Sequence, residues 1–337
     1  MNKVSILTYW GVANYGAWTQ AYALNNVVRD IVGSKVEVEH LDYLEQSHYD
    51  MYYKTDERLH NAFQYSWNII PHSKHYDIDT IENEKFDTII TGADSIWTLK
   101  RSPGNADYHL AGYKLNAKRM IAYAPSSGIH TVEDGIEKEL EEGIKRYDEI
   151  SVRDETTAQI VEQTIGYKPK IVVDPALLWD FKKDCIIELP TFSEYIVVYG
   201  VHWTKKFIEE IVEFARKEKL MLISVGFYND WCDLNMRMIE LRGTEWIGFF
   251  AKAEYVVTST FHGLMVGLAY EKQIKYCQND FTRNRSETLI NDLGIVDMDD
   301  INQKLNYTII GPKLNEIRNA SKEWLERALN AEISKQG

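Results

Sequence analysis

Short apolar runs alternate along this chain with segments whose apolar residues recur every three or four positions. The first run, VSILTYW over residues 4–10, is followed by a short glycine-bounded loop. Ala17, Ala21, Leu24 and Val28 then fall at helical spacing. The pattern predicts a strand, a loop and a helix as the first structural unit.

The alternation continues in two series, which predicts two parallel sheets covered by helices on both faces. In the first series the further predicted strands cover 86–92, 119–125, 149–153 and 170–178, and the helices 133–147 and 155–166. A polar connector at 180–193 precedes the second series, with strands at 195–201, 220–227, 254–260 and 273–277 and helices at 204–218, 244–253 and 262–271. We therefore expect an α/β fold of two doubly wound, Rossmann-like domains that face each other across a cleft, with boundaries 1–180 and 190–312. A charged amphipathic helix follows from about Lys313 to Ile333.

Residues 43–76 depart from this rhythm, because they are crowded with Tyr and His and lack clean periodicity. Two interpretations stay open: a helical excursion packed on the first domain, or a mobile aromatic flap that touches a sugar or its lipid carrier. His72 and His75 have the i, i+3 spacing of a helix, but no third ligand is near them in the sequence, so we expect no metal there.

Composition excludes some classes of function. The net charge of −13 argues against nucleic-acid binding, which needs clustered Lys and Arg, but leaves room for a small anionic substrate. No stretch approaches the roughly 18 apolar residues of a membrane span. The three scattered cysteines favour neither a disulfide framework nor a zinc site, and a reducing cytoplasm is expected.

Polar residues follow several of the predicted strands, where α/β sheets place their ligands. The loop from Gly11 to Gly16 opens a helix and offers backbone N–H groups to an anion, although a plain turn is an equal alternative. It matches neither GxGxxG nor a Walker sequence. Asp94 could accept a hydrogen bond from a sugar hydroxyl, act as a base, or cap the next segment. Ser126 and Ser127 add hydroxyls at a third strand end.

Charged residues at strand ends are candidates for catalysis. Arg153 can grip a carboxylate or phosphate, or pair with Asp154 or Glu155. Asp174, before Pro175, is expected to be structural. The segment VVTSTFHG ends in His262 at the start of a helix, where catalytic groups are often displayed. The further candidates for positive charge in the same cleft are Arg283 and Arg285, at least one of which we expect at a solvated surface.

In this order, GVANYGAWTQAYAL, TGADSIW, YAPSSG, ISVRDE, VVDPALL and TSTFHG resemble the motifs of the polysaccharide pyruvyl transferase family, over residues 4 to about 265. TRNRSETLINDLGI is similar to the helix that usually follows. The resemblance implies GT-B architecture, with a C-terminal helix (313–337) that returns to the first domain. It also implies an acceptor side in domain 1–180 and a donor side in domain 190–312.

The resemblance implies transfer of pyruvate from phosphoenolpyruvate to two hydroxyls of a sugar, in the synthesis of a surface polysaccharide such as a capsule or exopolysaccharide. Arg153 would clamp the donor, His262 would be the general acid, and Asp94 completes the expected catalytic set. No metal or redox cofactor is required. The expected partners are phosphoenolpyruvate and a glycan acceptor, free or linked to a lipid at the inner face of the cell membrane. The expected substrate-binding residues are Gly11, Asn14, Tyr15, Gly16, Gln20, Gly92, Trp97, Ser126, Ser127, Ser259, Thr260, Phe261, Gly263, Arg283 and Arg285.

The chain departs from the family pattern at three places. Gly92-Ala93-Asp94 stands where the family commonly has Gly-Ser-Asp, so Ala93 replaces a serine. Ser259 stands where an acidic residue is frequent, and Ser127 where an aromatic residue is frequent. These departures concern the acceptor more than the reaction. Two rival functions remain: a GT-B glycosyltransferase that uses a nucleotide sugar, and a non-catalytic carbohydrate-binding relative.

Overall fold

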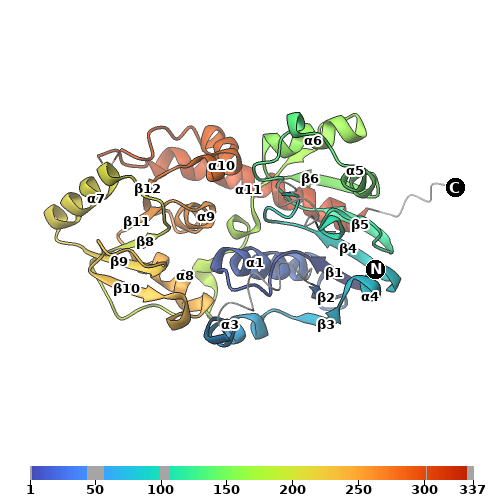
Figure 1. The fold of residues 1–337 in the computed structure, drawn as a ribbon, viewed down its shortest axis with the longest axis horizontal. Helices are drawn as coiled ribbons and strands as arrows, with labels where there is room; N and C mark the ends of the chain where they lie inside the picture. The colour runs from blue at the N-terminus through green and yellow to red at the C-terminus, as the bar shows by residue number, and fades with distance from the viewer. Residues whose placement is uncertain (1, 44–56, 99–106, 301, 332–337) are drawn as a thin grey trace.

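The computed structural model describes residues 2–43, 57–98, 107–300 and 302–331. Its chain forms two parallel sheets, each covered by helices, with helix α1 (Tyr15–Val32) between them (Figure 1). The prediction of two doubly wound α/β domains is confirmed by this arrangement.

The first sheet has the strand order β3-β2-β1-β4-β5-β6-β7, and every neighbouring pair is parallel. The strands are β1 (Lys3–Leu7), β2 (Glu37–Tyr43), β3 (His72–Tyr76), β4 (Phe86–Thr91), β5 (Ala117–Ala122), β6 (Glu149–Val152) and β7 (Lys170–Ile171). Strand β1 ends at Leu7, so residues 8–10 belong to the loop that follows and not to the predicted strand.

The apolar pattern did not predict β2, which reads EVEHLDY. Its buried polar side chains Glu39 and His40 each have a partner inside the fold. Glu39 forms an ion pair with Lys3 at 2.9 Å, and Nε2 of His40 lies 3.1 Å from the carbonyl oxygen of Ala21. Buried strands of parallel sheets are usually continuously apolar. The polar residues of β2 break that pattern, so the sequence did not predict a strand here.

The second sheet has the order β10-β9-β8-β11-β12 and is also parallel. Its strands are β8 (Tyr195–Tyr199), β9 (Met221–Gly226), β10 (Leu234–Arg237), β11 (Tyr255–Thr258) and β12 (Gln273–Tyr276). In both sheets the strand order reverses direction at one point, between β1 and β4 in the first and between β8 and β11 in the second. Ligands of doubly wound folds bind at such points.

The remaining helices cover the two sheets. They are α3 (Glu57–Ile69), α4 (Ile78–Asn83), α5 (Lys138–Ile144), α6 (Glu155–Ile165), α7 (Lys205–Glu218), α8 (Gly243–Lys252), α9 (Phe261–Ala269) and α10 (Asp280–Leu293). Short 3-10 helices are η1 (Tyr108–Ala111), η2 (Val132–Asp134), η3 (Pro175–Leu177), η4 (Phe181–Lys183) and η5 (Met238–Glu240). The helix predicted over 133–147 is shorter than expected, because Gly135 has a φ of +86° that separates η2 from α5.

The aromatic segment 43–76 contains the helix α3 and the strand β3, while residues 44–56 lie outside the described part of the chain. The helical spacing proposed for His72 and His75 is wrong, because both residues lie on β3. Phe63 and Trp67 of α3 are buried against the interdomain core, which is what a packed helical excursion requires.

Aromatic packing joins the two domains on one side. Tyr15 of α1 stacks on Trp246 of α8 with ring centroids 5.3 Å apart, and its hydroxyl donates to the carbonyl oxygen of Leu241 at 2.8 Å. A Cβ on Gly243 would lie 2.5 Å from the ring of Trp18, so only glycine allows this approach. A single apolar cluster therefore extends from the first domain into the second.

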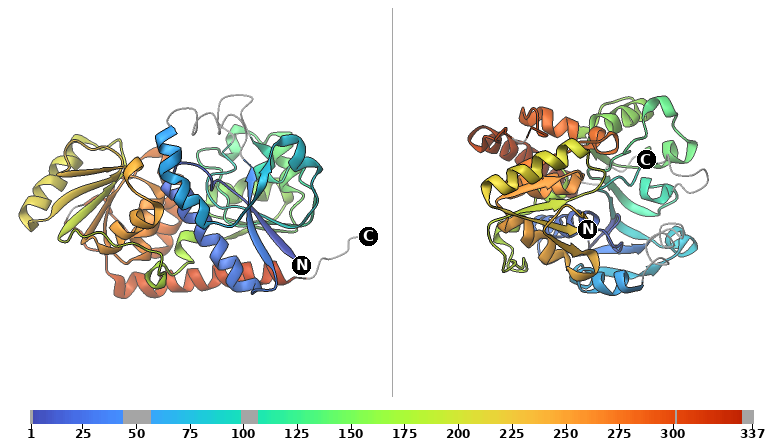
Figure 2. Two further views of the ribbon diagram at one scale, coloured as in Figure 1. Left: turned by 90° about the horizontal axis from the view of Figure 1, so that it is seen from below. Right: turned by 60° about the vertical axis from the view of Figure 1, so that its left-hand side comes forward.

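Helix α11 (Tyr307–Asn330) runs beneath both sheets (Figure 2). Its Ile310 and Leu314 belong to the cluster that includes the second domain, whereas Trp324 and Leu325 pack with the first sheet. It begins before the predicted Lys313, because Asn306 caps it and Pro312 is accommodated inside it. No helix in the described part of the chain combines the length and hydropathy needed to cross a membrane.

Candidate active site

A cleft of about 640 Å³ opens between the two domains at both reversal points. We call it the interdomain cleft. The first domain contributes the loop after β1 and the turn after β4, with Tyr9, Asn14 and Asp94. The second domain contributes the loops after β8, β11 and β12. The volume lies within the range of small-molecule sites, roughly 300–1,000 Å³.

The N-termini of three helices meet at this cleft, and each has a polar cap that lines it. Asn14 caps α1 by accepting from the backbone N–H of Gly16 at 2.9 Å, and Thr260 caps α9 by accepting from that of Gly263 at 3.0 Å. Asn279 caps α10. Neither α1 nor α9 has an acidic residue in its first turn, so their positive ends favour an anion in the cleft.

His262 lies in the first turn of α9 and touches the other domain. Its side chain is only about 10% exposed. A Cβ on Gly16 would lie 2.3 Å from Nδ1 of His262, so glycine at this position lets α1 approach the imidazole. The predicted glycine loop and the predicted histidine, which are far apart in the sequence, are thus in direct contact.

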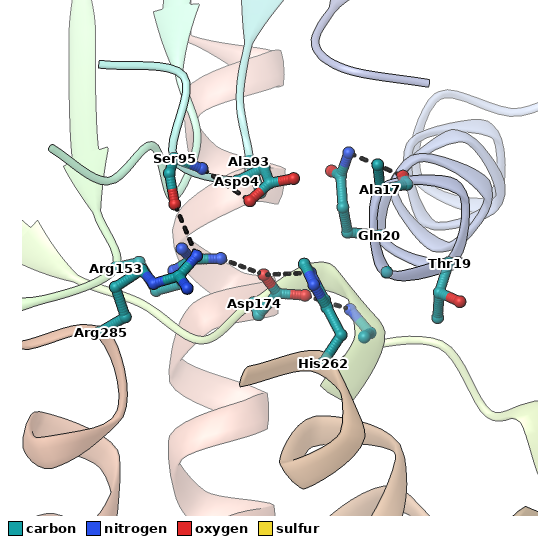
Figure 3. A network of polar contacts seen from close by, with 12 residues as sticks. Ala17, Thr19, Gln20, Ala93, Asp94, Ser95, Arg153, Asp174, His262 and Arg285 are labelled. Atoms are coloured by element: carbon teal, nitrogen blue, oxygen red, sulfur yellow. Dashed lines mark hydrogen bonds and ion pairs between the residues drawn. The ribbon is translucent and has the colours of Figure 1, made fainter. Parts of the chain in front are cut away.

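A chain of charged groups lies beside His262. Nη1 of Arg153 donates to Oδ2 of Asp174 at 2.7 Å, and the same oxygen lies 3.7 Å from Nε2 of His262. Asp174 lies between the other two side chains (Figure 3). Arg153 and Asp174 have side chains 2% and 0% exposed, so both are shielded from water. The sequence suggested Asp154 or Glu155 as the partner of Arg153. In the structure the partner is Asp174 instead.

Asp174 is held ionised by its neighbours. Burial would raise the pKa of its carboxyl, but the adjacent His262 and the charge of Arg153 outweigh burial and lower the pKa to about 2. The other oxygen, Oδ1, accepts from the backbone N–H of Ala176 at 3.0 Å. At 3.7 Å this carboxylate is too far from Nε2 of His262 for a hydrogen bond, and Nε2 is buried without a hydrogen-bond partner, so the two side chains form an ion-pair contact only.

Arg285 of α10 brings a positive charge directly to the cleft. Its Nη1 donates to Oγ of Ser95 at 2.8 Å, and its guanidinium lies over the ring of Phe261 at 5.9 Å. Burial and the charge of Arg153 lower its pKa to about 10, although Asp94 acts in the opposite direction. The guanidinium therefore remains charged at neutral pH.

Asp94 lines the first domain's side of the cleft. Its backbone has a φ of +70°, and its Oδ1 accepts from the N–H of Ser95 at 2.7 Å. Its carbonyl oxygen accepts from the N–H of Ser126 at 2.9 Å, which ties the turn after β4 to the strand end after β5. A carboxylate is thus presented to the same space as His262.

The structure brings part of the predicted set together. Those that line the interdomain cleft are Asn14, Asp94, Ser259, Thr260, Phe261, His262 and Arg285. Gly16 and Gly263 pack behind it, against His262 and against the hydroxyls of Thr258 and Thr260. Arg153 lies beneath the cleft, with its guanidinium 4.1 Å from the centre of the Phe261 ring.

Other predicted residues have contacts elsewhere. Buried Tyr15 joins the domains, while buried Gln20 donates to Oγ1 of Thr8 and to the carbonyl of Tyr9, which fixes the loop after β1. Trp97 donates to the carbonyl of Leu110, and Gly92 packs against the carbonyl of Tyr123.

Two serines and one arginine also lie away from the cleft. The hydroxyl of Ser126 donates to Asp154 and that of Ser127 to the carbonyl of His130. Arg283 is exposed on α10. The remaining predicted residue, Gly11, lines a different pocket of the first domain.

Sequence reasoning missed Asp174, which it interpreted as structural. A signal was available, because Arg153 and Asp174 follow the adjacent parallel strands β6 and β7, whose ends meet at one edge of the sheet. Asn279 and His202 were missed as well. Among the described residues, no group of three or more His, Cys, Asp or Glu is arranged to hold a metal ion.

Comparison with known proteins bears on both family and fold. The sequence profile described as "Polysaccharide pyruvyl transferase" matches residues 14–274. Among curated proteins, no sequence matches the chain. The structure of UDP-GlcNAc 2-epimerase from Methanocaldococcus jannaschii has a TM-score of 0.51 and 10% identity, covering 95% of this chain and 93% of that one.

A second similar structure is UDP-GlcNAc 2-epimerase from Neisseria meningitidis bound to UDP-GlcNAc. Its TM-score is 0.50 with 10% identity, and the match covers 98% of this chain and 95% of that one. At this identity the similarity concerns the fold alone, and it confirms the expected GT-B architecture.

Proposed function

The chain belongs to the polysaccharide pyruvyl transferase family, and we propose that it transfers the pyruvyl group of phosphoenolpyruvate to two hydroxyls of a sugar residue. The product is a cyclic ketal, and phosphate is released. The observation that carries this proposal is a cleft lined by His262, Arg285 and three helix N-termini, with the ion pair Arg153–Asp174 buried beside His262. Such a cleft suits a donor with a phosphate and a carboxylate.

In the first half of the reaction, His262 donates a proton to the methylene carbon of phosphoenolpyruvate, which leaves cationic character at the carbon that bears phosphate. A sugar hydroxyl attacks this carbon and forms a C–O bond. Asp94, which lines the same cleft as His262, accepts the hydroxyl proton. Phosphate then leaves with the electrons of its C–O bond.

In the second half, a neighbouring hydroxyl of the same sugar attacks the carbon and closes the ketal ring. Asp94 passes the proton of the first hydroxyl to the departing phosphate, and the proton of the second hydroxyl restores protonated His262. The balance of atoms and electrons is complete with donor and acceptor alone, so we expect no cofactor.

Arg285 fits the role of donor clamp better than Arg153, because Arg285 lines the cleft whereas Arg153 is buried beneath it. Arg153 acts as a positioning residue: it fixes the carboxylate of Asp174, whose negative charge lies 3.7 Å from Nε2 of His262. The acceptor belongs to a surface polysaccharide, and a lipid-linked acceptor would place the enzyme at the inner face of the cell membrane.

The test is phosphate release from phosphoenolpyruvate with a panel of sugar acceptors, for the wild type and His262→Ala. We expect acceptor-dependent release by the wild type and a loss of roughly 10²–10⁴-fold in kcat in the variant, the usual contribution of a general acid. Donor binding, followed by calorimetry, should survive the substitution and show that the variant is folded. No release with any acceptor, together with binding of a nucleoside diphosphate, would contradict the proposal and favour a glycosyltransferase.

A further inference from the structure

A second pocket, of about 320 Å³, lies in the first domain at the ends of β1 and β2 and beside α3. We call it the side pocket. Its walls include Trp10, Trp67, His60 and His72, and its rim includes the amides Gln64 and Asn68. Its volume is at the lower end of small-molecule sites and suits one or two sugar units.

The aromatic walls of the side pocket are fixed in place. Trp10 donates its indole N–H to the carbonyl oxygen of Leu41 at 2.8 Å, and its ring lies 4.8 Å from that of His72. Trp67 packs edge-on against His60, with ring centroids 4.9 Å apart. Because these indoles are nearly buried and ordered, a ligand that contacts them does not have to immobilise them.

The rim offers both donors and acceptors. Gln64 and Asn68 are one turn apart on α3, both exposed, and Nε2 of Gln64 donates to Oδ1 of Asn68 at 3.1 Å. Asp42 supplies a carboxylate, and Nδ1 of His75 lies 3.4 Å from it. Among the described lining residues there is no Lys or Arg, so the pocket is suited to a neutral polyhydroxylated ligand and not to an anion.

A register shift between β2 and β3 brings both strand histidines to this pocket. His40 pairs with His72 but Asp42 pairs with His75, so the edge strand has an extra residue here. Nδ1 of His72 lies 2.9 Å from the carbonyl oxygen of Ile70 and must carry the proton of that hydrogen bond. In the neutral imidazole, Nε2 is then an acceptor for a ligand hydroxyl.

The side pocket and the interdomain cleft share a wall. Along the loop after β1, Thr8, Trp10 and Gly11 line the side pocket, while Tyr9 and Val12 line the cleft. An oligosaccharide that crosses this loop would occupy both spaces with neighbouring sugar units. The loop is held from behind by Gln20.

We propose that the side pocket is a glycan subsite that binds the sugar unit next to the one modified in the interdomain cleft. The proposal rests on the proposed function, because it assumes that the acceptor reacts in the cleft. It makes the enzyme selective for an oligosaccharide or polymer over a free monosaccharide.

Direct binding tests the subsite without requiring turnover. The probes are methyl glycosides of glucose, galactose, mannose and N-acetylglucosamine and their β-linked disaccharides, followed by saturation-transfer NMR and titration with the full chain. Asn68→Ala and Gln64→Ala should each weaken binding about 3- to 10-fold, the cost of one hydrogen bond, and the double variant more. The matched control is Asn61→Ala, an exposed asparagine of the same helix that does not line the pocket, which should leave binding unchanged.

Kinetics supply the second readout. Asn68→Ala should raise KM for an oligosaccharide acceptor about 3- to 10-fold and leave KM for phosphoenolpyruvate unchanged. Saccharide binding that depends on Asn68, without phosphate release, would keep the subsite and reject the proposed reaction. Failure of every probe to bind the wild type, or equal binding by the double variant, would overturn the subsite.

Discussion

The interdomain cleft and the side pocket share the loop after β1, yet they offer ligands opposite chemistry. The cleft has a buried guanidinium and three helix N-termini, which favour negative charge, beside the imidazole of His262. The side pocket has indoles, imidazoles and amides. Its described lining residues include no Lys or Arg. Under the two proposals, a chain with a net charge of −13 binds an anionic donor on one side of this loop and a neutral glycan on the other.

The largest effect on donor binding is expected when the cleft loses the positive charge of Arg285. We expect Arg285→Gln to raise KM for phosphoenolpyruvate about 10- to 100-fold, since a charged hydrogen bond contributes about 1.5–3 kcal/mol. Arg283→Gln, two residues away on the exposed face of α10, is the matched control and should change KM less than about twofold. Steady-state phosphate release measures both. Equal effects would mean that the cleft attracts the donor by general charge and not through Arg285.

The next effect is a loss of folding stability at acid pH, because the ionised carboxylate of Asp174 stabilises the folded chain. The pKa of Asp174 is about 2 in the folded chain and near 3.9 in an unfolded one, so it contributes stability that is present above about pH 4. This contribution, on the order of 2 kcal/mol, is lost as the pH falls through about 2. Denaturant unfolding between pH 5 and pH 2 should show that loss in the wild type.

Asp174→Asn removes the titration and provides the control. The variant should be less stable than the wild type at pH 7, because a buried guanidinium loses its ionised partner, and the difference should shrink toward pH 2. A difference that stays constant with pH would show that Asp174 does not carry the charge assigned to it.

The smallest expected effect is the coupling between the two regions. Arg285 and Asn68 line different spaces and share no described contact, so their effects on kcat/KM should add within about 0.5 kcal/mol. The measurement is a double-mutant cycle of Arg285→Gln and Asn68→Ala with an oligosaccharide acceptor. A larger coupling energy would indicate that the loop after β1 transmits occupancy from one site to the other.

Much of the fold follows from the periodicity of the sequence. Strands such as β8, with every residue buried, and helices such as α7, with one apolar face, are recognisable from their own residues. Strand β2 was not, because the partners of Glu39 and His40 come from β1 and α1. Contacts with β1 and α1 thus stabilise β2 as a strand although its own residues lack the apolar pattern of one.

The site was predicted less completely than the fold. His262, Asp94 and Arg285 were found because they follow strands, where ligands of α/β sheets bind. The pairing of Arg153 with Asp174 depends on the order of strands in the sheet, and the side pocket depends on a register shift in β3. Neither feature can be predicted from the apolar and polar pattern of the neighbouring residues.

The contact between Gly16 and His262 makes the geometry of the cleft depend on how the two domains are aligned. The proposed proton donor, His262, belongs to the second domain, and the helix end that touches it belongs to the first. The proposed reaction therefore requires that the two domains keep the alignment in which α1 and His262 are in contact. The stacking of Tyr15 on Trp246 holds α1 against α8, so we expect substitutions in this interface, although they lie outside the cleft, to change the position of α1 relative to His262.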